Sequence, residues 1–345
     1  MPHGNLLTAI LWSAIPAIIL LAGIYYLDRY EKEPARLIAI ALGAGAIVAP
    51  VLTAWIQKAF DVPNSVGTSQ AIVIPEFVNA NQAIIEEIVL GLVMLGVFFI
   101  VRYELDDLLD GLVYGAVVGV GFGMAANFWI VWTTPDLLGG PSTHSLASTV
   151  VSSFNWVFYA GVIGLFLGFA RRGSIAKVLG MAVAGTVVAM GFHLLHDYLP
   201  VWVATSQTDV ASSGVARFLT DLPNILGLVA LAVIAVWVSG KEKMLVGKEL
   251  QDEVASGVVT ADDYNTIVGP FKRFGVLAGA LGKGVSHWKL QRRLYVLEVE
   301  LAFRKHHDQS DRTTPAKLLT PDEYRRQIVE TRQALGAAPA AEATS

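Results

Sequence analysis

The stretch NQAIIEEIVLGLVMLGVFFIV, Asn81 to Val101, decides the fold class. Nearly all of its residues are apolar, and its length matches the roughly 20 residues that an α-helix needs to cross a hydrocarbon layer about 30 Å thick. It nevertheless carries two adjacent carboxylates, Glu86 and Glu87. An ionisable group at the centre of a bilayer costs about 2.5 to 3.5 kcal/mol even on a mild scale, so the pair indicates a functional site.

The rest of the chain has the same character. Of 345 residues, 54% are apolar and 16% charged, and the mean hydropathy is +0.54, which is typical of a membrane protein. We therefore predict an all-α, polytopic bundle of about seven transmembrane helices. The expected spans are residues 5–27, 37–57, 81–101, 110–132, 148–170, 177–199 and 222–239. The first lacks a cleavage site and is expected to be retained as an anchor.

Charge fixes the expected orientation and domains. The short loops on one side carry seven Lys or Arg residues and those on the other side two, which predicts an N-terminus outside and a cytoplasmic C-terminus. We expect a transmembrane bundle over 1–240, a helical cytoplasmic tail over 241–335 and a disordered end over 336–345. The net charge of -4 does not indicate a nucleic-acid partner, and the absence of Cys excludes disulfides and thiol chemistry.

The tail carries helix signals of its own. Thr260 and Thr320 each precede an acidic residue by three positions, the pattern of an N-cap. A set of leucines at helical spacing would pack either against the membrane surface or against other tail helices. These leucines are Leu290, Leu294, Leu297 and Leu301.

Polar residues of four expected spans reach the same depth, near the outer surface. The third span brings Glu86 and Glu87 there, and the sixth brings His193, with Asp197 one turn further on the same face. The fourth and fifth spans bring Asn127 and Asn155, which could also serve only as interhelical hydrogen bonds. We predict one site from this convergence. His196, in contrast, is expected to be interfacial.

Three chemistries suit such a site. A glutamate and His193 could activate a water by general base catalysis. Glu86 or Glu87, together with His193 and Asp197, could instead hold a divalent metal. Buried carboxylates could also carry protons or a cation across the membrane.

The fourth span also carries a packing signal. Glycines recur at every fourth residue and so form one stripe along the helix, which lets a neighbouring helix approach closely. The stripe consists of Gly111, Gly115, Gly119 and Gly123 and leads to Asn127.

At these residues the chain resembles the PrsW family of intramembrane proteases, related to the CAAX prenyl proteases and bacteriocin-processing enzymes. The resemblance rests on YYLDRYEKEP at Tyr25–Pro34, the glutamate pair, DGLVYGAVVGVGFGMAAN at Asp110–Asn127, and HLLHD at His193–Asp197. It implies an endopeptidase of the bacterial cytoplasmic membrane that cuts a single-span, anti-sigma-factor-like protein near the membrane surface. It also implies catalytic roles for Glu86, Glu87, His193, Asp197 and Asn127, with or without zinc.

Two positions depart from the family pattern. Ala126 stands where the family has Glu, and Asn155 or Trp156 where it has His. The chain is therefore expected to be a working intramembrane protease or, as an alternative, an inactive relative that binds a membrane partner in the same cleft. An ion or proton pathway is the third hypothesis.

Overall fold

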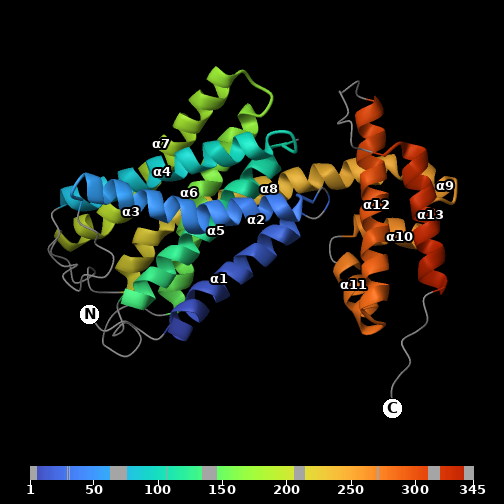
Figure 1. Ribbon diagram of the computed structural model, residues 1–345, viewed down its shortest axis with the longest axis horizontal. Helices are drawn as coiled ribbons and strands as arrows, with labels where there is room; N and C mark the ends of the chain where they lie inside the picture. The colour runs from blue at the N-terminus through green and yellow to red at the C-terminus, as the bar shows by residue number, and fades with distance from the viewer. Residues whose placement is uncertain are drawn as a thin grey trace, which may run out of the picture. The chain divides into compact units, whose positions relative to one another are not determined.

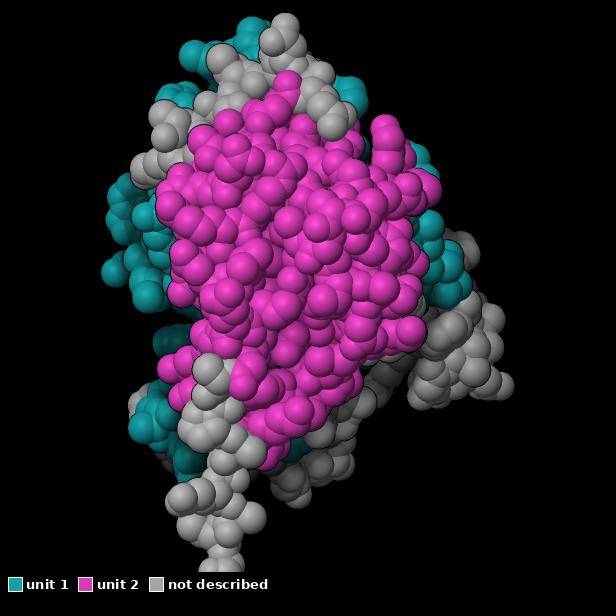
Figure 2. Space-filling view, turned by 90° about the vertical axis from the view of Figure 1, so that its right-hand side faces the viewer, with its two compact units in different colours: residues 1–238 teal, residues 239–345 magenta. Residues whose placement is uncertain are grey.

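The computed structural model describes residues 6–28, 30, 32–62, 76–105, 107–133, 146–205, 214–269, 272–309 and 319–337. The chain divides into two compact units, residues 1–238 and 239–345, and each is described by itself (Figures 1 and 2). The described residues of both units are helical, with no strand among them.

Unit 1 is the expected bundle of long apolar helices. Seven helices of the described chain are long and apolar enough to cross a membrane, and each overlaps one of the seven expected spans. This confirms the fold class. One span each is formed by α1 (Leu6–Leu27), α4 (Glu76–Val101), α5 (Leu108–Thr133), α6 (Leu146–Ala170), α7 (Ile175–Thr205) and α8 (Gly214–Glu249). The last continues past its expected end at residue 239, because α8 is helical to Glu249. The second span is formed by three consecutive elements, α2 (Ala35–Gly43), η1 (Ala44–Val48) and α3 (Ala49–Ala59).

The second span differs from a regular α-helix. It consists of α2, one π-helical turn (η1) and α3, which has Pro50 in its first turn. A π turn contains an extra residue, so it rotates every following side chain by about 100° relative to an uninterrupted α-helix. The face that α3 turns towards the rest of the bundle therefore depends on η1.

Helix α5 lies at the centre of unit 1, and 83% of its most apolar window is buried. It packs along α6 and also against α1, α2 and η1 (Figure 1). Glycines permit this approach: a Cβ added at Gly115 would lie 2.4 Å from the Ala160 carbonyl oxygen, and one at Gly164 would lie 2.1 Å from that of Gly111. The predicted glycine stripe is thus the contact surface between α5 and α6.

Two carboxyl groups, Asp28 and Glu33, hold the connection between α1 and α2, and Glu33 also bonds to α5. Asp28 accepts a hydrogen bond from the Glu33 backbone N–H at 3.1 Å, and the Tyr114 hydroxyl donates to Glu33 at 2.5 Å. Burial raises the pKa of Asp28 to about 7 and the pKa of Glu33 to about 10. Both values lie above those of the unfolded chain, so their contribution to stability falls as the pH rises above about 4 towards the folded values.

Unit 2 contains the last turns of α8 and five further helices. These are α9 (Gln251–Ala255), α10 (Ala261–Val268), α11 (Lys272–Gly282), α12 (Val285–Gln309) and α13 (Pro321–Ala337). The N-cap prediction at Thr260 is confirmed, because its hydroxyl oxygen accepts from the Asp263 N–H at 3.0 Å. At Thr320 the corresponding bond, from the Glu323 N–H, is 3.3 Å long.

Three of the four predicted leucines of α12 pack inside unit 2. Leu294, Leu297 and Leu301 form its core with Tyr324 and Ile328 of α13, which favours packing between tail helices over a membrane-facing helix. Of the segment 336–345, expected to be disordered, the first two residues belong to α13 and the others lie outside the described residues.

Candidate functional site

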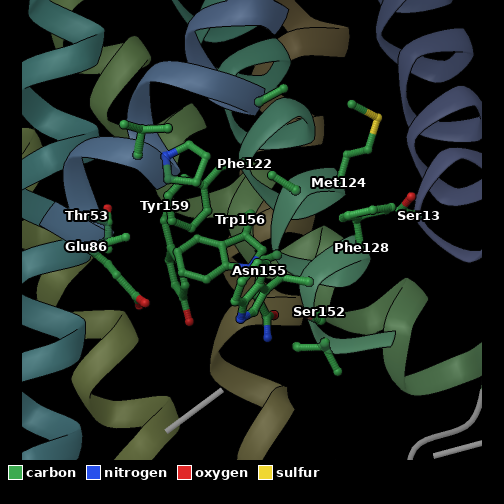
Figure 3. Close-up of a pocket in the computed structure, with 18 of the residues that line it drawn as sticks. Ser13, Thr53, Glu86, Phe122, Met124, Phe128, Ser152, Asn155, Trp156 and Tyr159 are labelled. Carbon is green, nitrogen blue, oxygen red and sulfur yellow. The ribbon is translucent and has the colours of Figure 1, made fainter. Parts of the chain in front are cut away.

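A cavity of about 1150 Å³ opens between the helices of unit 1 (Figure 3). Side chains from α1, η1, α3, α4, α5, α6 and α7 line it, and most of them are apolar. Titratable groups enter it at one end, where Glu86 lies on α4 and His193, His196 and Asp197 lie on α7. The cavity therefore combines a large apolar chamber with one polar, ionisable end.

His193 joins the two glutamates of α4 to α7. Its Nδ1 lies 2.9 Å from Glu87 Oε1, and its Nε2 faces Glu86 Oε2 at 3.9 Å. The Gln82 side-chain amide, one turn earlier on α4, donates to the other Glu86 oxygen at 3.0 Å. Glu87 is fully buried and Glu86 lines the cavity, so the adjacent carboxylates occupy different environments.

A second imidazole extends this cluster. Asp197 places one carboxylate oxygen 3.8 Å from His193 Nε2 and the other 3.2 Å from His196 Nδ1. His196 Nε2 in turn lies 3.0 Å from Asp221 Oδ1 of α8 and 3.3 Å from the Asn155 amide of α6. Carboxylates and imidazoles thus alternate from Glu87 on α4, through α7, to Asp221 on α8.

Aromatic rings from α6 fix the position of His193. The Tyr159 ring stacks on the imidazole with centroids 4.7 Å apart, and Trp156 approaches it edge-on at 5.3 Å. The Asn224 amide of α8 donates to the Tyr159 hydroxyl at 2.6 Å. Tyr159 and Glu86 direct their polar ends towards the same part of the cavity (Figure 3). Contact with the rings of Trp156 and Tyr159 restricts rotation of the His193 side chain.

The structure brings four of the five predicted catalytic residues together: Glu86, Glu87, His193 and Asp197. Asn127, the fifth, is not among the cavity-lining residues. Its buried amide donates to Ser153 at 2.7 Å across the contact between α5 and α6. This contact agrees with the alternative that Asn127 forms a hydrogen bond between helices.

Sequence reasoning missed His196, Asp221 and Tyr159. His196 follows His193 by three residues, a spacing that places both on neighbouring positions of one helix face, and this signal was available. His196, expected to be interfacial, lines the cavity and contacts two aspartates. Asp221 stood just before the expected seventh span, and nothing in the sequence singled out Tyr159.

The residues of the cluster do not fit a zinc ion as they stand. The predicted ligands Glu87 and Asp197 face opposite nitrogens of His193, so one ion cannot take all three. On the cavity side, Glu86 and Asp197 lie 3.9 and 3.8 Å from His193 Nε2, whereas two ligands of a tetrahedral zinc are about 3.3 Å apart. Among the described residues, no three His, Cys, Asp or Glu side chains form a metal-binding group.

Comparison with known proteins gives one match. Residues 33–238 match the family model described as PrsW family intramembrane metalloprotease. No curated protein and no solved structure matches the chain. The matched residues include every helix that contributes to the cavity except α1, as well as the whole carboxylate and imidazole cluster.

Proposed function

We propose, from the premise that the chain belongs to the PrsW family of intramembrane metalloproteases, that it hydrolyses a peptide bond of a single-span membrane protein. The observation that carries the proposal is the position of Glu86. Its carboxylate lines a cavity between membrane-spanning helices and lies 3.9 Å from a histidine that a second glutamate holds in place. A carboxylate and an imidazole at this spacing can activate one water between them.

In the proposed mechanism, Glu86 is the general base. Glu86 lines the cavity and Glu87 does not, so of the two glutamates only Glu86 can contact a water in the cavity. Glu86 Oε2 takes a proton from this water while the water oxygen attacks the peptide carbonyl carbon. The same carboxyl then gives the proton to the amide nitrogen as the C–N bond breaks, so one residue serves as base and then as acid.

His193 stabilises the oxyanion that forms during attack. In this role its Nδ1–H donates to Glu87, and its Nε2–H points to the side of the ring where Glu86 and Asp197 lie. A donor fixed in advance stabilises the developing negative charge without reorganisation. Glu87 thus acts through His193 as a positioning residue, in the manner of a carboxylate that orients a catalytic imidazole.

A second candidate is binding without cleavage. Ala126 and Asn155, the positions that depart from the family pattern, both line the cavity. A chain with these replacements could still bind a membrane protein in the cavity. It would lack the Glu and the His that the family pattern has at these two positions.

The experiment that tests the function is cleavage by the protein reconstituted in lipid vesicles. Labelled single-span peptides serve as substrates, with and without a zinc chelator. We expect wild-type cleavage at a bond within the membrane segment, with a rate that changes less than twofold on chelation, because side chains alone carry the proposed steps. Cleavage that ends on chelation and returns with zinc would contradict the side-chain mechanism. Binding of the peptides with no cleavage under either condition would favour the second candidate.

Asp221→Asn should slow cleavage only moderately, because Asp221 does not line the cavity and acts on Asp197 through His196. We expect the turnover rate to fall roughly three- to tenfold, corresponding to about 1 kcal/mol of hydrogen-bond energy, with an unchanged KM. The measurement is peptide cleavage over a range of substrate concentrations. Asp221→Glu restores the charge and should recover part of the rate; equal losses in both variants would argue against this positioning role.

A further inference from the structure

Two buried polar residues of α3 face the cavity but are not explained by the proposed mechanism. Thr53 and Gln57 are 5% and 4% exposed, line the cavity, and lie one turn apart on the same side of the helix. Within the described part of the chain, neither the Thr53 hydroxyl nor the Gln57 amide nitrogen has a hydrogen-bond partner. A threonine in a helix usually bonds to a carbonyl of the preceding turn, and Thr53 does not.

Unpaired polar atoms inside a membrane bundle are costly, so their positions require an explanation. The π turn η1 supplies a structural one, because it rotates α3 so that Pro50, Thr53 and Gln57 share the face that lines the cavity. Close contact fixes η1 in turn: a Cβ at Gly45 would lie 2.0 Å from the Val118 carbonyl oxygen of α5. The polar face of α3 is therefore held in place on the cavity wall.

Resting on the proposed function, we propose that Thr53 and Gln57 bind the main chain of an unwound substrate segment. A peptide bond becomes accessible to attack only when its helix opens, and within lipid the freed N–H and C=O groups must then find partners in protein. The Gln57 amide nitrogen can donate to a peptide carbonyl, and the Thr53 hydroxyl can donate or accept. Both atoms are buried in the free protein, so binding a substrate in the cavity would require rotation about their side-chain torsions.

The size and composition of the cavity agree with this ligand. Its volume of about 1150 Å³ exceeds the roughly 300 to 1,000 Å³ of sites for small molecules. Apolar walls suit the side chains of a membrane segment, and Thr53 and Glu86 come from α3 and α4, which pack against each other (Figure 3). A main chain held along α3 would therefore lie beside the residue assigned as the base.

The test measures binding and does not require catalysis. Two labelled peptides of about 20 residues are compared in nanodiscs with Glu86→Gln protein, one an uninterrupted Leu-Ala helix and the other carrying Asn-Gly-Pro at its centre. We expect the interrupted peptide to bind about tenfold more tightly, and the preference to disappear when Thr53→Val and Gln57→Leu are added. Equal binding of both peptides, or a preference that persists in the added variants, would overturn the inference.

Ser13→Ala is the matched control. Ser13 also lines the cavity, but its hydroxyl already donates to the Ile10 carbonyl at 3.0 Å, so its removal should leave the preference intact. Loss of the preference in this variant too would contradict a specific role for α3. Thermal unfolding without peptide should be unchanged or improved in the Thr53 and Gln57 variants, because they remove unpaired groups. A clear loss of stability would show that these atoms have partners in the free protein, which contradicts the proposal.

The outcomes separate this inference from the proposed function. A preference that depends on Thr53 and Gln57 supports the binding role even when the wild-type protein cleaves neither peptide. Wild-type cleavage with no dependence on these residues supports the protease alone.

Discussion

Glu86→Gln should lower the rate of peptide cleavage by about 10²- to 10⁴-fold, the contribution typical of a general acid or base. The neutral amide has nearly the shape of the carboxyl group but cannot take a proton from water. Gln82 can still donate to the side-chain oxygen at this position, so the local structure should be kept. The measurement is the single-turnover rate in vesicles, together with peptide binding, which we expect to change less than threefold.

Two further variants frame this result. Glu104→Gln makes the same chemical change at an exposed position just after α4 and should leave the rate unchanged. Glu87→Gln should also slow cleavage, because it weakens the contact that orients His193. If Glu86→Gln retains more than a tenth of the wild-type rate, Glu86 is not the base.

The sequence was sufficient to predict the spans and the meeting of the charged groups. Long apolar segments admit few structures in lipid, and alternate crossing directions bring groups at known depths together. It could not identify which glutamate faces the cavity. Neighbouring residues of a helix point about 100° apart. The boundaries of an expected span are uncertain by one or two residues, so the direction of a given side chain around the helix cannot be assigned from them.

The partner of Asn127 and the face of α3 that lines the cavity depend on contacts that a single sequence does not show. Asn127 continues the glycine stripe of α5, so the close packing that the stripe predicts also carries Asn127 towards α6 and Ser153. The π turn η1 has no marker of its own in an apolar segment. It sets which residues of α3 line the cavity, so the sequence alone does not place Thr53 and Gln57 on the cavity wall.

Gly164→Ala should destabilise unit 1 by about 2 kcal/mol, which is within the usual cost of overpacking a core. The added methyl group would lie 2.1 Å from the Gly111 carbonyl oxygen, and backbone atoms cannot move aside as a side chain can. Helices α5 and α6 would have to separate, and Trp156 and Tyr159 of α6 would move away from His193. We therefore expect the unfolding midpoint to fall by roughly 4 to 8 °C and the cleavage rate to fall with it.

Gly180→Ala on α7 is the control, because nothing lies within 4 Å of its added methyl group and alanine favours a helix. Equal unfolding midpoints for the two variants would mean that the close approach of α5 and α6 does not hold the site together.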